Sequence, residues 1–267
     1  MREINLLGTV RVESSDTDLP RFRSQRAMAL LGYLAIEGRP ITRNQLAALF
    51  WPDDAPESGK KKLRRELYNL AQILPDCWET DRLKVHFVPS METTIDLDTI
   101  QQFEQEGNWE AAADLLRGDF LEGLALEDNF EFETWLLGER ERWRQRTASI
   151  LTYAADELEG QGSYRRALLY AQRLLRVMPW REEAHRHMMR LLALSDQRSA
   201  ALKQFAICEQ VLWDELGVEP SAETLALYER IKRSPHYSRD NIPATATPLI
   251  GREGELEALS AQLADPD

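Results

Sequence analysis

The spacing of leucines and cations in residues 57–74, ESGKKKLRRELYNLAQIL, predicts one helix with two different faces. At about 100° per residue, one stripe of this helix contains Leu63, Leu67, Leu70 and Leu74. The opposite side carries cations and hydrogen-bonding groups, namely Lys61, Arg65, Tyr68 and Gln72, with Lys62 and Asn69 beside them. The leucine stripe predicts packing against a protein core, which leaves the other face for solvent or for a partner.

Shorter elements are predicted before this helix. Alternating apolar residues in INLLGTVRV indicate two short strands joined by a turn at Gly8 and Thr9. A helix then runs from a capping residue at Ser24 to about Ile36, because Gly38 is a typical helix end. A second helix opens with a capping box, and a Trp-Pro pair stops it; the box is formed by Thr42 and Gln45.

A β-hairpin is predicted after the two-faced helix. Apolar residues there alternate with Lys84 and His86 and indicate one strand of the hairpin, at Leu83, Val85 and Phe87. The order of elements is therefore strands, three helices and a hairpin, which is typical of a winged helix-turn-helix. In that fold the third helix enters the major groove of DNA and the hairpin is the wing.

The second part of the chain has helical patterns only. From about Asp96 onward strand signals vanish, and Phe130–Leu158 is one long amphipathic stretch. Residues 162–168 align with residues 196–202 at an offset of 34, and a weaker copy lies at 107–112. This period indicates tetratricopeptide-type helix pairs, with a small residue where two helices touch, although chance similarity between amphipathic helices is the alternative. Tryptophans are expected to fill gaps between these helices, at Trp109, Trp135, Trp143, Trp180 and Trp213.

The fold class predicted is mainly α with a small β component, in which a winged helix precedes an all-α helical repeat domain. The net charge is −12, but residues 1–90 have a balance of +2 and the remainder −14. Five of the six residues 60–65 are basic. Since phosphate binding needs local cations, the first part can bind DNA, whereas the acidic second part is better suited to a protein partner.

Other functional classes find little support. No apolar run approaches the roughly 20 residues of a membrane span, and the start has no secretory signal, so we expect a cytoplasmic protein. Cys77 and Cys208 make neither a disulfide framework nor a metal motif. The four histidines have no cysteine or carboxylate partner at ligand spacing, and no nucleophile elbow occurs. We expect no catalytic residue, no metal and no cofactor.

Several segments carry a family resemblance: LLGTVRV, SQRAMALLGYLA, ITRNQLAALFWPDDAP and, most specifically, WDELGVEPSAETLALYERI at residues 213–231. The chain resembles the SARP-type (antibiotic regulatory protein) transcriptional activators over residues 2–233. The resemblance implies an OmpR-like winged helix at 1–94 and a bacterial transcriptional activator domain at 95–233. It further implies binding to promoter direct repeats, with the helical domain making dimer or RNA polymerase contacts.

The C-terminal residues resemble a different domain. Residues 234–248 are rich in proline and polar residues and are interpreted as a linker. LIGREGELEAL within residues 249–267 resembles the entry to the nucleotide-binding domain of larger relatives, and we expect a truncated domain there. No GxxxxGK[ST] motif occurs in the chain, so no ATP site is expected in it.

DNA contacts are expected from the two-faced helix, the start of the second helix and the wing. Arg65 is the expected base reader, because arginine can bind guanine edges bidentately. The other candidates are Arg43, Lys60, Lys61, Lys62, Arg64, Tyr68, Asn69, Arg82 and Lys84. A second basic patch is interpreted as solvent-facing, at Arg21, Arg23 and Arg26.

Double-stranded DNA is thus the first expected partner, followed by RNA polymerase or another protein, with a homodimer on DNA. A solvated helix face would also explain an isolated basic cluster. The alternative function is a tetratricopeptide-type interaction or sensor module of a signal-transduction ATPase that does not bind DNA directly.

Overall fold

The computed structural model describes residues 1–14, 21–126 and 128–233. The predicted linker at 234–248 and the predicted domain start at 249–267 lie outside the described residues. The N-terminal part contains, in chain order, β1 (Arg2–Asn5), β2 (Arg11–Ser14), α1 (Gln25–Glu37), β3 (Ile41–Thr42), α2 (Arg43–Phe50), α3 (Pro56–Ile73), β4 (Trp78–Thr80), β5 (Lys84–Phe87) and β6 (Thr93–Ile95).

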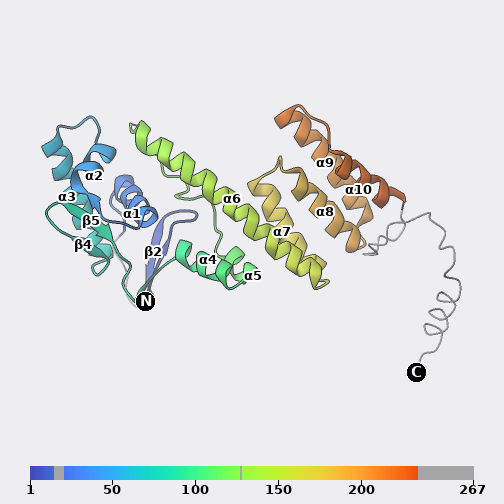
Figure 1. Cartoon of the computed structure of the whole chain (residues 1–267), viewed down its shortest axis with the longest axis horizontal. Coiled ribbons are helices and arrows are strands. Elements are labelled where there is room, and N and C mark those ends of the chain that lie inside the picture. The colour runs from blue at the N-terminus through green and yellow to red at the C-terminus, as the bar shows by residue number, and fades with distance from the viewer. Residues whose placement is uncertain (15–20, 127, 234–267) are drawn as a thin grey trace, which may run out of the picture.

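Only helices follow β6 in the described part of the chain, as the sequence predicts. They are α4 (Asp96–Gln105), α5 (Trp109–Asp114), α6 (Phe130–Gly160), α7 (Tyr164–Val177), α8 (Glu182–Leu194), α9 (Arg198–Leu216) and α10 (Ala222–Arg233). The molecule is elongated, with α2, α3 and the β4–β5 hairpin at one end and α9 and α10 at the other (Figure 1). The mainly helical fold with a small β component is confirmed.

The predicted helix ends are confirmed by their capping bonds. The hydroxyl of Ser24 accepts a hydrogen bond from the Ala27 amide at 3.0 Å and opens α1, and Gly38 ends α1 in the left-handed region at φ 56°. Thr42 and Gln45 form the reciprocal bonds of the predicted capping box at the start of α2. These local bonds satisfy backbone groups that a helix end leaves without partners.

Two small sheets frame the first three helices. One has the strand order β2-β1-β6, with β1 antiparallel to β2 and parallel to β6; the other has the order β3-β5-β4. Neither β3 nor β6 is predicted, because strands of two and three residues have no measurable periodicity. The prediction that Leu83 belongs to the wing strand is wrong. Leu83 precedes β5, and the residue is 72% exposed.

The leucine stripe of α3 forms the centre of the N-terminal core. All four of its members are buried, from fully buried Leu70 and Leu74 to 8% exposed Leu67. Pro56 occupies the first turn of α3, where its missing N–H leaves no bond unmade. The helix packs against α1 and α2 through this stripe, so its opposite face must point away from the core.

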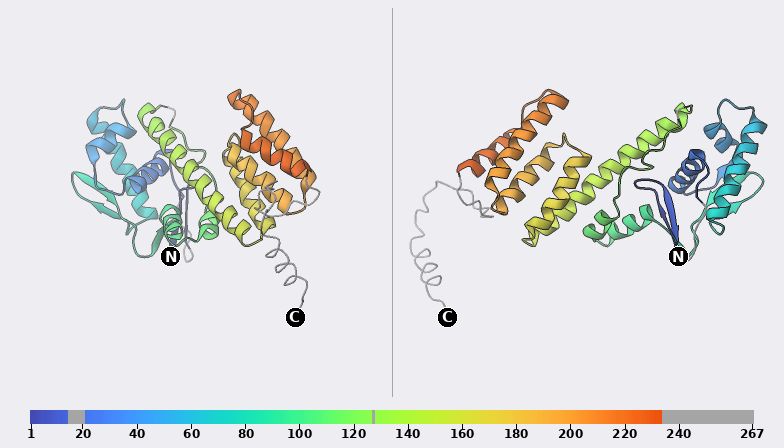
Figure 2. Two further views of the ribbon diagram at one scale, coloured as in Figure 1. Left: turned by 45° about the vertical axis from the view of Figure 1, so that its right-hand side comes forward. Right: turned by 180° about the vertical axis from the view of Figure 1, so that it is seen from behind.

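The helical repeats begin in a shared way. The first residue of each copy lies in the left-handed region, and the helix of the copy begins two residues later; these first residues are Gly107, Gly162 and Asp196. α7 and α9 begin at Tyr164 and Arg198, so the predicted offset of 34 residues is confirmed. The small residue of each copy is fully buried against neighbouring helices, at Ala112, Ala167 and Ala201. Figure 2 shows α6 as the long helix that leads from the N-terminal part to these repeats.

The N-terminus of α6 shares a core with the winged-helix elements. Phe132 on α6 lies 5.2 Å from Phe50 of α2, measured between ring centroids, and Trp135 lies 4.9 Å from Tyr33 of α1. The side-chain amide of Asn129 donates to the Leu49 carbonyl. The first helices and the long helix are therefore held in one packed arrangement.

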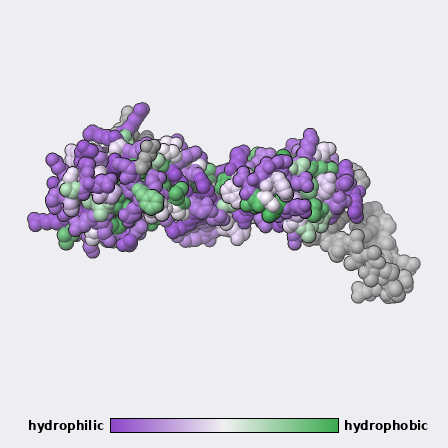
Figure 3. Space-filling model, turned by 90° about the horizontal axis from the view of Figure 1, so that it is seen from above, coloured by the Kyte–Doolittle hydropathy of each residue, from purple (hydrophilic) through white to green (hydrophobic). Residues whose placement is uncertain are grey.

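Two further expectations are corrected by this junction. Arg26 is not simply solvent-facing, because its guanidinium donates to Asp128 at 2.7 Å and to the Phe50 carbonyl. Of the tryptophans expected between repeats, Trp135 lies at the junction, and Trp180 and Trp213 are 44% and 62% exposed. Seen from above, the surface is mostly hydrophilic, with hydrophobic patches over both halves of the molecule (Figure 3). Within the described residues no helix is both long and apolar enough to cross a bilayer.

A buried carboxylate clamps α6 to α8. Glu159 accepts a hydrogen bond from His187 at 3.0 Å, and both of its oxygens accept from Arg190 at 3.0 Å. Burial alone would raise the pKa of the Glu159 carboxyl, but the bonds from His187 and Arg190 outweigh it and hold the pKa at about 2. Glu159 is therefore ionised in the folded protein at neutral pH.

This clamp predicts a loss of stability in acid. Since the folded pKa of Glu159 lies below its ordinary value of 4.5, its contribution is complete above about pH 4.5 and falls as pH drops toward 2. Glu159→Gln should lower the free energy of unfolding by about 1–3 kcal/mol at pH 6. It should also flatten the pH dependence between pH 4.5 and 3, measured by urea denaturation. Glu157→Gln, an exposed change on the same helix, is the control; equal pH dependence in all three proteins would contradict the clamp.

Candidate nucleic-acid interface

The outer face of α3 is exposed along its length. Lys61, Arg64 and Arg65 are exposed, the Arg65 side chain to 73%, and the Tyr68 residue to 65%. No element among the described residues covers these side chains. The predicted separation of an inner apolar face from an outer cationic face is therefore what the structure shows.

Glu66 is a buried anchor of α3 that the sequence reasoning missed. Its residue is 3% exposed, and its carboxylate accepts hydrogen bonds from Ser24 at 2.9 Å, Asn69 at 3.4 Å and Arg65 at 3.3 Å. Because Ser24 also caps α1, one carboxylate connects the two helices. Helical geometry could have predicted that Glu66 faces inward, since it lies within about 60° of Leu63 and Leu70 on the helix.

Lys62 and Asn69, two of the predicted contact residues on α3, form hydrogen bonds with other residues of the chain. Lys62 donates to Asp54 at 2.6 Å, and this hydrogen bond holds the pKa of Asp54 below its ordinary value. Asn69 donates to Glu66. Both residues flank the outward face of α3, and both would have to release these partners to reach a ligand.

A cationic groove lies between α3, the start of α2 and the hairpin. It has a volume of about 880 Å³ and is lined by five of the predicted residues, namely Arg43, Lys60, Arg64, Arg82 and Lys84. Lys60 also pairs with Glu57 at 3.0 Å. The structure thus brings side chains from three separate elements to one surface, which adjoins the outer face of α3.

The hairpin is held against α2 by backbone bonds. The Arg43 amide donates to the Leu83 carbonyl at 2.8 Å, and the Arg43 guanidinium donates to the Asp81 carbonyl at 3.1 Å. The Asp81 carboxylate accepts the amides of Lys84 and Leu83, both at 2.6 Å, and these bonds lower the pKa of Asp81. Asp81 therefore shapes the tip of the wing, although sequence reasoning assigned it no role.

The chemistry of this surface is that of an anion-binding face. Eight of the ten predicted residues are cations, and Tyr68 and Asn69 add hydrogen-bonding groups. Lys61, Arg65 and Tyr68 form its centre, the groove forms one flank, and Lys62 and Asn69 form the other. A convex helix beside a cationic concavity fits a ligand with a regular row of phosphates.

Two of the four histidines have carboxylate partners that sequence spacing could not reveal. His86 lies 3.2 Å from Glu79 on the neighbouring strand, and His187 pairs with Glu159. In the described part of the chain, Asp156, Glu159 and His187 are near enough to hold a metal ion. However, the Arg190 guanidinium already bonds both oxygens of Glu159, so a cation would have to displace a cation. We propose no metal at this cluster.

Comparison with known proteins agrees with the class that this architecture defines, a winged helix joined to helical repeats. The family described as "Bacterial transcriptional activator domain" matches residues 99–232, half of the chain. The chain belongs to this family and is a SARP-type transcriptional regulator.

Individual relatives are distant in sequence. The chain is 25% identical to the regulatory protein AfsR of Streptomyces griseus over 97% of its own length, but it spans only 29% of AfsR. It is 22% identical to the transcriptional regulatory protein MoaR1 of Mycobacterium bovis, over 86% of this chain and 79% of MoaR1. Among solved structures, Mycobacterium tuberculosis EmbR in complex with a low-affinity phosphopeptide is similar, with a TM-score of 0.65 and 21% identity. That alignment covers 87% of this chain and 65% of EmbR, and at this identity the likeness concerns the fold alone.

The buried and exposed partners of one ion pair should differ in their effect on stability. Glu66→Ala leaves the Ser24 hydroxyl without its acceptor and should lower the free energy of unfolding by about 1–3 kcal/mol. Arg65→Ala removes only an exposed charge and should change it by less than about 0.5 kcal/mol. Chemical denaturation measures both variants. Equal losses would show that Glu66 does not anchor α3.

Proposed function

We propose that this regulator binds promoter DNA with the outer face of α3 in the major groove. The single observation that carries the proposal is the exposure of Lys61, Arg65 and Tyr68 on a helix whose opposite face is fully seated in the core. A major groove about 12 Å wide admits one α-helix, and only a helix free on one side can enter it.

Different residues on this surface are assigned different contacts. Arg65 is the proposed base reader, because it lies at the centre of the outer face and its exposed guanidinium, after exchanging its bond to Glu66, can bind a guanine edge with two hydrogen bonds. The groove cations are the proposed phosphate contacts, since they come from the rim of the surface, at Arg43, Lys60, Arg64, Arg82 and Lys84. Lys62 and Asn69 are proposed to contribute after exchanging their internal partners.

The helical part is proposed to bind proteins. Residues after 90 carry a balance of −14, which would repel DNA. We propose that residues 1–94 form the DNA-binding unit, and that residues 95–233 support a second copy on promoter direct repeats or contact RNA polymerase. Exposed apolar side chains near the end of α9 support such contacts, at Trp213, Leu216 and Val218.

A second candidate function, a protein-interaction module without DNA binding, is favoured by the same acidic helices. Mixing the chain with random duplex DNA at low salt separates the two candidates. The proposed function predicts binding that weakens steeply as salt rises, because cation–phosphate contacts release counterions. Absence of binding at low salt would contradict the proposed DNA binding and support the protein-interaction module.

The double variant Lys61→Ala and Arg65→Ala tests the interface itself. Loss of two contacts should weaken binding to a promoter fragment by about 100-fold or more and reduce the slope of affinity against salt by about 2. Electrophoretic retardation over a range of salt concentrations measures both effects.

Lys203→Ala, an exposed change on α9, provides the matched control and should retain wild-type affinity within about twofold. Circular dichroism confirms that each variant is folded. Wild-type retardation by a folded double variant would overturn the assignment of α3.

A further inference from the structure

A second groove lies between α6, α7 and the segment that joins α5 to α6, and it shares no lining residue with the α3 surface. Its volume is about 700 Å³. Four guanidiniums line it, from Arg117, Arg144, Arg173 and Arg176, against two carboxylates, from Asp119 and Glu122. In a chain of net charge −12, a groove with more cations than anions is a local exception and a candidate site for an anion.

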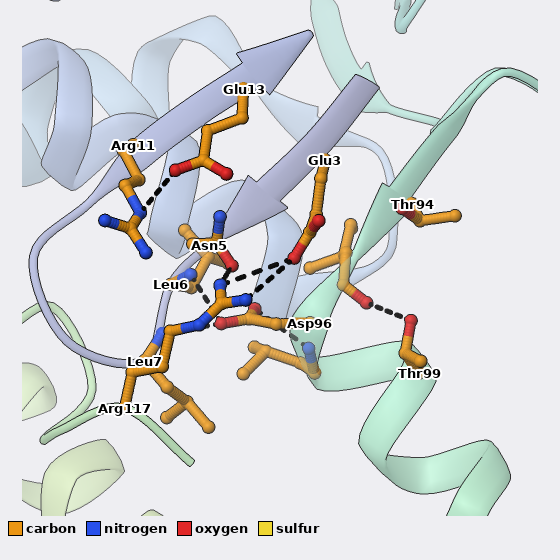
Figure 4. Close-up of polar contacts among 12 residues, drawn as sticks. Glu3, Asn5, Leu6, Leu7, Arg11, Glu13, Thr94, Asp96, Thr99 and Arg117 are labelled. Carbon is orange, nitrogen blue, oxygen red and sulfur yellow. Dashed lines mark hydrogen bonds and ion pairs between the residues drawn. The ribbon is translucent and has the colours of Figure 1, made fainter. Parts of the chain in front are cut away.

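One wall of this groove is fixed to the first strand of the winged-helix part. The Gly8 amide donates to the Asp119 carbonyl at 2.8 Å, and the Glu122 amide donates to the Gly8 carbonyl at 3.0 Å. The Arg117 guanidinium extends back over β1 and binds Asn5 and Glu3, the latter at 3.3 Å (Figure 4). This wall is therefore attached to β1 and to the turn that follows it.

The other wall is α7, which contains four arginines and no acidic residue. Arg166 pairs with Glu110 outside the groove. Arg173 is half-buried, and one of its nitrogens donates to the carbonyls of Ala113 at 2.7 Å and Leu116 at 2.8 Å. Arg176 is exposed on the same side of the helix, three residues on.

The charges of the groove do not cancel. Arg144 is neutralised by Asp119 at 3.0 Å, and Arg117 by Glu3. This leaves Arg173 and Arg176 against the single carboxylate of Glu122, an excess of one positive charge. Among the described residues no carboxylate lies within ion-pair distance of Arg173 or Arg176. Burial lowers the pKa of Arg173, and the charge of the nearby Asp114 offsets this loss of water only in part. Such a cation is costly to keep unpaired, and a bound anion would offset the cost.

Apolar side chains accompany Arg173 and Arg176 in the lining of the groove. Val177, Pro179 and Trp180 line the same groove, and Trp180 is 44% exposed. An indole next to guanidiniums suits a ligand that combines a flat ring with a charged group. The volume also falls in the usual range for small-molecule sites, about 300–1,000 Å³.

We propose that this groove binds a small phosphorylated ligand that carries a planar group, such as a nucleoside monophosphate. Arg173 and Arg176 hold the phosphate, and the Trp180 side chain packs against the planar group. A ligand in this position bridges the β1 wall and the α7 wall, so it connects the winged-helix part to the helical repeats. The site does not depend on the proposed DNA contact.

Isothermal titration calorimetry of the 267-residue chain, without DNA, tests the site with AMP, adenosine and inorganic phosphate as probes. AMP should bind, and adenosine and phosphate should each bind at least about tenfold more weakly, because each lacks one half of the recognised chemistry. Trp180→Ala should weaken AMP binding but leave phosphate binding unchanged.

Arg176→Glu should weaken AMP binding by about tenfold or more. This variant is expected to fold, because Arg176 is exposed and forms no ion pair with the residues that the structure describes. Arg165→Glu is the matched control, since Arg165 is exposed on the same helix outside the groove, and it should change affinity by less than about twofold. Equal effects of the two variants, or no heat from AMP at about 10 mM, would overturn the proposal.

Discussion

The seating of α3 is the constraint on which the other features of this molecule depend. Four leucines on one side of the helix are buried against α1 and α2, and Glu66 on the same side binds the residue that caps α1. Rotation of α3 would bury its lysines and expose its leucines, so the direction of the outer face is fixed. The aromatic contacts of Phe132 and Trp135 then attach the long helix α6 to this core. Packed side chains therefore connect the core that holds α3 to the long helix that leads into the repeats.

Local patterns in the sequence predicted the elements that are stabilised locally. The structure confirms the caps at Ser24 and Thr42, which depend on neighbours within a few residues. It also confirms the buried alanines, which were predicted from the sequence repeat. Contacts between distant segments were not predictable in this way. The pairing of β1 with β6 and the bond from Arg26 to Asp128, 102 residues away, leave no periodic trace in either segment.

For the candidate interface, the direction of the side chains on α3 was predictable from the sequence, but their hydrogen-bond partners were not. The outward direction of Lys61, Arg65 and Tyr68 follows from helical geometry once the leucines are placed inward. The partner of Lys62 and the role of Asp81 in the wing depend on side-chain positions in loops, and both were missed. The bond from Asn69 to Glu66, three residues away on the same helix, was missed because Glu66 was not placed on the inner side. Glu66 shows the physical reason most clearly. Its place on the apolar face follows from helical geometry, but its role as an anchor depends on its hydrogen bond to Ser24, which is 42 residues away in the sequence.

Selection of bound sequences from a random duplex library tests the central claim most directly, because every possible operator sequence competes in the same pool. If the outer face of α3 enters the major groove, repeated selection should enrich a short motif, and a dimer on DNA should enrich it as two direct repeats at a constant spacing. A pool whose composition stays that of the input, with a folded protein at low salt, would contradict the claim.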